Sequence, residues 1–307
     1  GVVMAMQGSS ISNCDVGSVT VKLSDEGTYH ITVGCTDMGT GCDTIIAQFA
    51  ADVLETPIDN ISVYGVDTDI SPYDSGSYAS STTYLTGMAA VKACEQLREH
   101  IIALAAARMN KDASALTFDG ENVIDESDGS KMSLFDIATA SMCNNEISME
   151  VTYSHSSPVS PPPFMAAWAE VEVDPETGAI ELLDYTACVD CGTVVNTNLA
   201  RVQTEGGLLQ GIGMTLYEDI WYDERGKNLS NSFMQYKVPS RLDTDRIRVE
   251  FDSSYEPTGP FGAKSIGEIV INTPAPAIAD AVYNATGVWI NELPITPEKI
   301  LKGMQVI

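Results

Sequence analysis

The sequence predicts a mixed α+β fold in which strand pairs and helices interleave. Residues 17–33 alternate apolar and polar side chains on both sides of a turn at 24–27, which is typical of a β-hairpin. Residues 85–109 instead place their apolar side chains at helical spacing. No strand–helix–strand unit recurs at a fixed period, so we expect mixed sheets rather than a regular parallel sheet.

The composition is that of a strongly acidic globular chain. Of its 307 residues, 44% are hydrophobic, which suffices for two ordinary domains or one large one. The 43 acidic residues exceed the 16 basic ones and give a formal net charge of −27. Nucleic acids and anionic membranes require basic patches, so we expect neither as a partner. No run approaches the ~18 consecutive apolar residues of a membrane span.

Seven scattered cysteines indicate reduced thiols. Only Cys188 and Cys191 form a C-x-x-C pair, and the chain has three histidines. We therefore expect no zinc or iron–sulfur ligands in this chain, and a cytoplasmic location. The chain starts at Gly1, in sequence typical of a domain interior, so we interpret it as a fragment, a processed chain or one subunit of a larger assembly.

Two loops rich in small and hydroxyl-bearing residues each precede a predicted helix. The first spans 34–41, and the helix after it ends before Pro57. The second spans 74–83, follows a short strand at 61–66, and leads into the long helix at 85–109. Loops that present backbone N–H groups at a helix start can hold an anion. The recurrence favours a phosphate- or pterin-sized ligand between the loops, with two ordinary capped helices as the alternative.

A proline-rich connector at 154–163 divides the chain into two predicted lobes. The first lobe spans 1–153 and carries both hydroxyl-rich loops; the second spans 164–307. Within the first lobe, 110–145 is a peripheral excursion with a hairpin and a short helix after Ser133.

The second lobe combines strands with a helix that contains several glycines. A turn at 174–178 joins two strands, and further strands are expected at 217–222 and 246–251. The helical period of 196–213 is interrupted by glycines, which a helix retains for close packing or for close approach of a ligand. A capped helix at 296–300 ends the chain.

The segment 259–268 carries the candidate for acid–base chemistry. Three glycines and a proline make its backbone irregular and able to approach a ligand closely. Glu268 follows Gly267 and precedes a helix that we expect to begin at Pro274, with Thr273 as its cap. A single carboxylate in this position is a candidate general base, and a solvated glutamate at a helix entry is the alternative.

Several motifs occur in one order and carry a resemblance to a known family. They are TDMGTG at 36–41, ASST at 79–82, DCG at 190–192 with Asn196, QTEGG at 203–207 with QGIG at 210–213, and GAKSIGE at 262–268. With this set, almost the whole chain resembles the C-terminal half of the molybdopterin-binding region of the xanthine dehydrogenase/aldehyde oxidase family of molybdenum hydroxylases. It is most similar to the bacterial xanthine dehydrogenase-like and purine hydroxylase branch.

The resemblance implies hydroxylation of a C–H bond on a small aromatic heterocycle, a purine such as xanthine or hypoxanthine, with water as the oxygen source. Glu268 matches the family's catalytic glutamate and would act as general base, a role suited to a carboxylate shielded from solvent. Lys264 and Gly267 match supporting positions beside it. The positions that match cofactor-contacting segments are Met38, Gly39, Thr40, Ala79, Ser80, Ser81, Thr82 and Gln203.

Two matched positions depart from the family pattern. Thr40 stands where the family often has glutamine, which removes a side-chain amide contact to the cofactor. Met4 stands where the animal enzymes have a phenylalanine, so Met4 would line the substrate pocket without aromatic stacking.

Other parts of such enzymes have no counterpart in this sequence. The resemblance implies that the first half of the molybdopterin region, the iron–sulfur clusters and FAD belong to other chains or missing domains. The cofactor, molybdopterin or its cytosine dinucleotide form, would lie between the halves, so we expect this chain alone to be inactive and free of cofactor. The sequence leaves three alternatives open: oxidation of nicotinate or an aldehyde, assembly as a homodimer, and a purely structural or assembly role.

Overall fold

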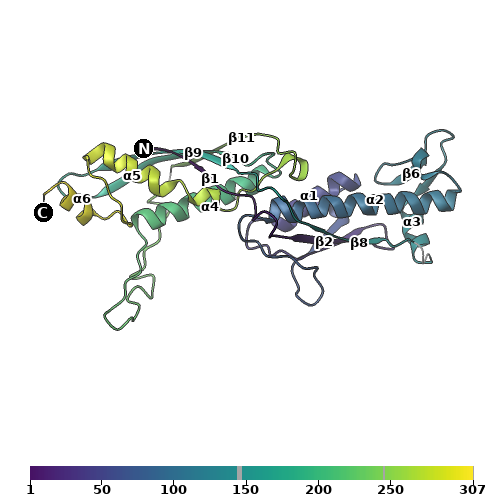
Figure 1. The fold of residues 1–307 in the computed structure, drawn as a ribbon, viewed down its shortest axis with the longest axis horizontal. Coiled ribbons are helices and arrows are strands. Elements are labelled where there is room, and N and C mark those ends of the chain that lie inside the picture. The colour runs from purple at the N-terminus through teal and green to yellow at the C-terminus, as the bar shows by residue number, and fades with distance from the viewer. Residues whose placement is uncertain (144–146, 245, 307) are drawn as a thin grey trace. The chain divides into compact units, whose positions relative to one another are not determined.

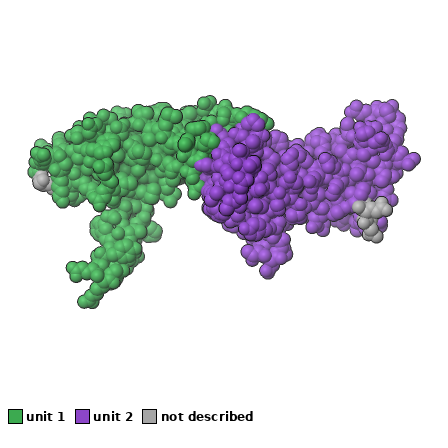
Figure 2. Space-filling view, viewed as in Figure 1, with its two compact units in different colours: residues 1–7, 162–255, 266–307 green, residues 8–161, 256–265 purple. Residues whose placement is uncertain are grey.

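Two separate β-sheets, each packed against helices, organise the chain. The computed structural model describes residues 1–143, 147–244 and 246–306. Unit 1 comprises residues 1–7, 162–255 and 266–307, and unit 2 comprises the two segments that remain, 8–161 and 256–265 (Figure 2).

The two units are not continuous in sequence, whereas the predicted lobes were. The first seven residues join unit 1 because strand β1 (Val2–Met6) pairs with β9 (Phe164–Val173). The segment 256–265 returns to unit 2 although it follows the last strand of unit 1. Long-range strand pairing of this kind leaves no local trace in the sequence.

Unit 1 is built on a four-stranded sheet in the order β1-β9-β10-β11 (Figure 1). The pairs β1–β9 and β9–β10 are antiparallel, and β10–β11 is parallel. The remaining elements of the unit are β10 (Ile180–Asp190), α4 (Thr197–Leu216), β11 (Ile247–Asp252), a short 3₁₀ turn (Ile269–Ile271), α5 (Pro274–Thr286) and α6 (Pro297–Gly303).

The core of unit 1 lies between this sheet and the helices α4 and α5. Strand β9 alternates as predicted, with Met165, Ala167 and Ala169 buried and Trp168 and Glu170 exposed. The helical residues that complete the core are Leu208 and Ile212 of α4 and Ala277, Ile278 and Val282 of α5.

Unit 2 contains a second four-stranded sheet in the order β4-β3-β2-β8, with a small three-stranded sheet β5-β6-β7 at its periphery. The predicted hairpin, both helices that follow the hydroxyl-rich loops and the short helix capped by Ser133 are all present. The bounds are β2 (Gly17–Leu23), β3 (Tyr29–Val33), α1 (Cys42–Leu54), β4 (Ile61–Tyr64), a π-helical turn (Thr82–Thr86), α2 (Gly87–Met109), β5 (Leu116–Phe118), β6 (Asn122–Asp125), β7 (Lys131–Ser133), α3 (Leu134–Ser141) and β8 (Glu150–His155), with 3₁₀ turns at Ile58–Asn60, Ala113–Ala115 and Pro260–Gly262.

The strand predicted at 217–222 is wrong. Helix α4 continues to Leu216, and the segment after it forms no ladder beyond one bridge between Tyr222 and Asn228. Ile220, Trp221 and Tyr222 are each more than half exposed. Their aromatic and β-branched side chains are typical of a strand, but among the described residues no strand pairs with this segment.

Thr273 does not cap helix α5 through its side chain, contrary to the prediction. Its hydroxyl is fully buried, accepts a hydrogen bond from the Tyr185 hydroxyl at 2.9 Å, and donates to the sulfur of Met165 at 3.6 Å. Tyr185 buries its ring in the core, and its hydroxyl needs a partner there, which Thr273 supplies. Pro274 does start the helix as predicted, and Gly287 ends it in the left-handed region.

The helices that the structure describes include none that is both long and apolar enough to cross a membrane.

Candidate functional site

The first hydroxyl-rich loop joins β3 to α1 in unit 2 and is held by one carboxylate. Asp37 Oδ1 accepts hydrogen bonds from the backbone N–H groups of Gly39 at 2.9 Å and Gly41 at 3.1 Å, and its Oδ2 accepts from that of Asp43 at 3.4 Å. Desolvation raises the pKa of Asp37, but the backbone donors together outweigh it and bring the pKa below its usual value. Asp37 therefore remains an ionised acceptor that fixes the loop.

The tip of this loop faces solvent. Met38 is 66% exposed, and Gly39 has a φ of 103°, in the left-handed region that favours glycine. A Cβ built at Gly39 would meet nothing within 4 Å. The three predicted cofactor residues Met38, Gly39 and Thr40 thus form an open surface on which backbone groups are accessible.

The second hydroxyl-rich loop is joined to the first, because Ser77 Oγ donates to the backbone oxygen of Thr36 at 3.2 Å. Ala79 and Ser80 both adopt left-handed backbone angles, with φ of 51° and 55°. This conformation costs a non-glycine residue about 1–2 kcal/mol. Such strain is often kept where a loop must present its groups to a ligand.

Buried hydroxyls gather around the strained dipeptide of the second loop. The Ala79 carbonyl accepts the N–H of Ser10 at 2.9 Å, and Ser81 Oγ donates to the Gly76 carbonyl at 2.9 Å. Ser10 is only 6% exposed, yet its Oγ has no hydrogen-bond partner among the described residues. A buried polar atom in this state is expected to be met by water or by a bound polar group. Thr82 then begins the π-helical turn.

In unit 1, the predicted base Glu268 is exposed and oriented by neighbouring amides. Its Oε2 accepts a hydrogen bond from Gln7 Nε2 at 3.3 Å, and Gln7 Oε1 in turn accepts from Asn272 Nδ2 at 3.0 Å. The side chain is exposed in this chain, so the shielding expected for a base is not provided here. The carboxylate is accessible to a substrate and held in one direction.

Gln203 of helix α4 supports the same loop. Its Nε2 donates to the Gly267 carbonyl at 2.9 Å, directly before Glu268. The glycines of α4 allow this close approach, since a Cβ at Gly207 would lie 2.1 Å from Cγ2 of Val270. The prediction that this helix keeps glycine for close packing is thus confirmed at Gly207.

The predicted site residues fall into two groups. Unit 2 holds both hydroxyl-rich loops and Lys264, which is 6% exposed. Unit 1 holds Gln203, Gly267, Glu268 and Met4. Met4 lies on the edge strand β1 and is 74% exposed, apart from the packed core.

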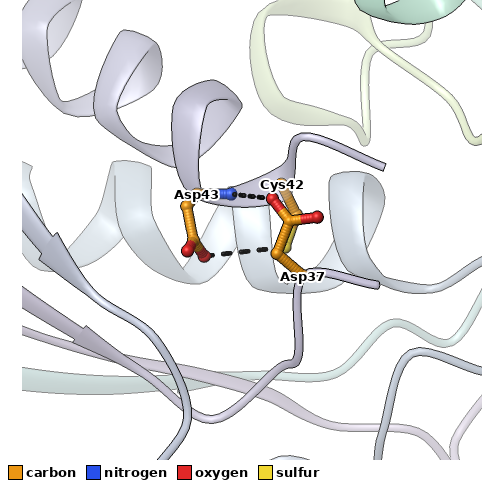
Figure 3. Close-up of side chains that lie close together, drawn as sticks. All are labelled: Asp37, Cys42 and Asp43. Atoms are coloured by element: carbon orange, nitrogen blue, oxygen red, sulfur yellow. Dashed lines mark hydrogen bonds between the residues drawn. The ribbon is translucent and has the colours of Figure 1, made fainter. Parts of the chain in front are cut away.

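Three contributors escaped the sequence analysis. Gln7 donates to Glu268 from 261 positions away, where the pairing of β1 with β9 brings it, and the nearby Asn272 donates to Gln7. Ser10 is unremarkable in a serine-rich stretch until its burial is known. The side chains of Asp37, Cys42 and Asp43, which the sequence analysis did not single out as a group, place their ligand atoms within 4.8 Å of one another (Figure 3). The spacing C-x-D-x₄-C-D at 35–43 was the available signal.

Comparison with known proteins identifies the family. The model of the molybdopterin cofactor-binding domain matches residues 1–245. The chain belongs to that family. Its relatives are molybdenum oxidoreductases of the xanthine dehydrogenase and aldehyde oxidase type, which confirms the resemblance drawn from the motifs and the mixed α+β fold.

The relatives of this molybdopterin cofactor-binding domain are much longer proteins. The probable hypoxanthine oxidase XdhD of Escherichia coli is 38% identical over 309 residues, covering 100% of this chain and 32% of that protein. The 6-hydroxypseudooxynicotine dehydrogenase complex subunit gamma of Paenarthrobacter nicotinovorans is 31% identical and covers 93% and 37%. This chain therefore spans about a third of the length of these relatives.

Solved structures show the same fold. Quinoline 2-oxidoreductase from Pseudomonas putida superposes with a TM-score of 0.90 at 26% identity, covering 99% of this chain and 41% of that one. Reconstituted CO dehydrogenase from Oligotropha carboxidovorans gives a TM-score of 0.89 at 25% identity, covering 100% and 40%.

Proposed function

We propose that the protein carrying this chain is a molybdenum hydroxylase that oxidises a purine of the hypoxanthine or xanthine type, with Glu268 as its general base. The observation that carries the proposal is the accessible Glu268 carboxylate, oriented by Gln7 on a loop to which Gln203 donates a hydrogen bond. A base must reach the proton it removes, and an oriented, accessible carboxylate meets that requirement. The 38% identity to a probable hypoxanthine oxidase supports the choice of a purine.

The residues of unit 2 fit a molybdopterin. In a chain of net charge −27, an anionic cofactor must be held mainly by backbone N–H groups and hydroxyls. Met38, Gly39 and Thr40 form the solvent-facing tip of one loop, and Ser80 and Thr82 carry hydroxyls on the other. The Gly39 N–H and the Ser81 hydroxyl are donated within the loops, to Asp37 and to the Gly76 carbonyl. The unpartnered Ser10 Oγ adds a donor that the family match does not assign.

When bound, the cofactor supplies two-electron oxidation of a C–H bond with water as the source of oxygen. The task of this chain's own residues is to move a proton. Glu268 would accept it at Oε1 or Oε2, while Gln7 keeps the carboxylate directed and Gln203 fixes the backbone before it. Lys264 would act as a supporting residue, and Met4 would line the substrate pocket.

Further polypeptide would complete the enzyme. Relatives with matching sequence are named as a complex subunit gamma, a large subunit and a large chain. We expect this chain likewise to work with iron–sulfur and flavin domains or subunits, which would carry electrons away from the site.

The test is the variant Glu268→Gln in the complete protein that carries this chain. We expect loss of hypoxanthine- and xanthine-dependent dye reduction with unchanged molybdenum content, because the amide keeps the shape of glutamate but cannot accept the proton. Glu292→Gln, at a residue whose side chain is 85% exposed, is the matched control and should retain activity.

Turnover of Glu268→Gln at the wild-type rate would overturn the assignment of the base. A wild-type complex without molybdenum, isolated from a host that makes the cofactor, would instead favour a structural or assembly role. Activity on aldehydes or nicotinate alone would reject the purine assignment.

A further inference from the structure

Three serines from distant parts of the chain join their hydroxyls beside the two segments that carry Gln7 and Glu268. Ser9 and Ser265 lie 256 positions apart in the chain, and their Oγ atoms are 2.9 Å from each other. Ser160 Oγ accepts the backbone N–H of Ser9 at 3.0 Å. All three belong to unit 2, and we call them the serine cluster. The proposed reaction assigns no role to any of them.

The contact between Ser9 and Ser265 is a reciprocal pair of hydrogen bonds. The backbone N–H of Ser265 donates to Ser9 Oγ at 3.1 Å. The Ser265 hydroxyl donates to the Gly8 carbonyl at 3.4 Å, which leaves the Ser9 hydroxyl to donate to Ser265 Oγ. Ser9 and Ser265 are 0% and 1% exposed. A buried network whose members all have partners is rigid, so these two positions are fixed to each other.

Ser160 ties the same point to the proline-rich connector. Its Oγ accepts from Ser9 and donates to the Ser10 carbonyl at 2.7 Å. Gly8 permits this approach, because a Cβ there would lie 2.7 Å from Ser160 Oγ. The segment around Ser9 is therefore fixed to the connector as well as to Ser265.

The segment that carries Glu268 is held on both sides of a flexible point. Gly267 directly precedes Glu268, and a glycine leaves the backbone free to turn. On one side of it, Ser265 is fixed by the serine cluster. On the other side, Ile269 and Val270 are buried, at 0% and 1% exposed. Loss of the first anchor would leave Gly267 free to shift the carboxylate.

The hydrogen bond between Gln7 and Glu268 is weaker than the anchors next to it. It is 3.3 Å long and exposed, so water competes for both groups. The buried contact between Ser9 and Ser265 lies two residues beyond Gln7 and three residues before Glu268. The direction of the carboxylate therefore depends on this buried contact.

We propose that Ser9 and Ser265 are positioning residues for Glu268, a role that rests on the proposed function of Glu268 as the base. They act along the backbone, by fixing the ends of the two segments that carry Gln7 and the carboxylate. Neither serine touches the substrate in this role. Their loss should therefore lower the rate of turnover rather than the affinity for substrate.

The test compares Ser265→Ala with the wild type in the complete protein, by steady-state kinetics with hypoxanthine, molybdenum content and hydrogen–deuterium exchange of residues 262–270. We expect kcat to fall about tenfold with KM and molybdenum content unchanged, because the carboxylate is misplaced. Exchange at residues 266–268 should become faster. Ser9→Ala should give the same loss of kcat, and the double variant no greater loss, since both changes break one contact.

Ser18→Ala is the matched control, because Ser18 is fully buried and shares a hydroxyl pair of 2.8 Å with Ser154, between strands β2 and β8. It should keep the wild-type kcat and the wild-type exchange at residues 266–268. A wild-type kcat or unchanged exchange in Ser265→Ala would overturn the positioning role, and so would an equal loss of kcat in Ser18→Ala. Turnover by Glu268→Gln would instead refute the base itself, which is a separate result.

Discussion

At the scale of single residues, the direction of the Glu268 carboxylate depends on Gln7. The Nε2–Oε2 hydrogen bond of 3.3 Å joins a residue at the end of β1 to one that is 261 positions later. Gln7 also holds Asn272, so one amide side chain orients both groups. A base that loses its orientation loses rate more than substrate affinity.

We therefore predict that Gln7→Ala lowers kcat by up to about 100-fold in the complete protein, with little change in KM. Steady-state kinetics with hypoxanthine checks this, and the thermal unfolding temperature reports any structural loss. Gln305→Ala, at an exposed glutamine near the C-terminus, is the control. An unchanged kcat in Gln7→Ala would show that Glu268 needs no such support.

At the scale of elements, helix α4 contains two adjacent glycines in opposite environments. A Cβ at Gly207 would lie 2.1 Å from Val270 Cγ2, whereas a Cβ at Gly206 would meet nothing within 4 Å. Gly207 is therefore required for packing, and Gly206 only weakens the helix.

Replacing each of these two glycines by alanine should change the free energy of unfolding in opposite directions. Gly206→Ala should raise the free energy of unfolding by up to about 1 kcal/mol, through helix propensity. Gly207→Ala should lower it by about 1–3 kcal/mol, because the methyl group forces helix α4 away from Val270. Urea denaturation of the two variants measures both values, and effects of the same sign would refute the packing argument.

The small sheet β5-β6-β7 is anchored to the end of helix α2 by Lys111. Its Nζ lies 2.8 Å from Asp125 Oδ2 and also contacts Asp128. Lys111 is the main cause that lowers the pKa of both carboxyl groups, with Ser127 and Ser130 as further donors.

The pH dependence of this anchor follows from the direction of these shifts. A carboxyl pKa that is lower in the folded protein than the unfolded value near ~3.9 stabilises the fold above that pH. The stabilisation is lost as pH falls through the folded pKa. Lys111→Met should thus lower the thermal unfolding temperature of unit 2 at about pH 7, and its difference from wild type should shrink toward about pH 2.

Thermal unfolding across this pH range tests the Lys111 prediction. Lys92→Met removes an exposed pair with Glu95 and serves as the control, since such surface pairs contribute little. If the thermal unfolding temperature of Lys111→Met is lowered by the same amount at every pH, the packing of the lysine side chain, and not its charge, is responsible for the stabilisation.

At the scale of the whole molecule, the candidate residues are divided between two structural units of one acidic chain. The phosphate-suited loops belong to unit 2, and the oriented carboxylate belongs to unit 1. Neither unit alone carries the full set that the proposed reaction needs. The chain also spans only about a third of the length of its relatives.

The sequence by itself determined the family, the fold class and the chemical character of the loops. Helix periods, hairpin turns and hydroxyl-rich segments are local properties, because neighbouring residues decide backbone conformation and hydrogen-bonding capacity. The order of the motifs along the chain identified the family in the same way. The helices α1, α2 and α3 and the closing helix α6 were accordingly predicted close to their observed bounds.

Only the tertiary structure decided how distant residues combine. The pairing of β1 with β9 brings Gln7 to Glu268, and the Tyr185 hydroxyl donates to Thr273, which does not cap its helix through its side chain. The fold also buries Ser10 Oγ with no hydrogen-bond partner among the described residues. The same applies to 217–222, which is rich in β-forming residues but, among the described residues, pairs only through the Tyr222–Asn228 bridge. Each outcome depends on which groups meet across the fold, and the free energy of those contacts is set by burial and partner geometry rather than by local sequence.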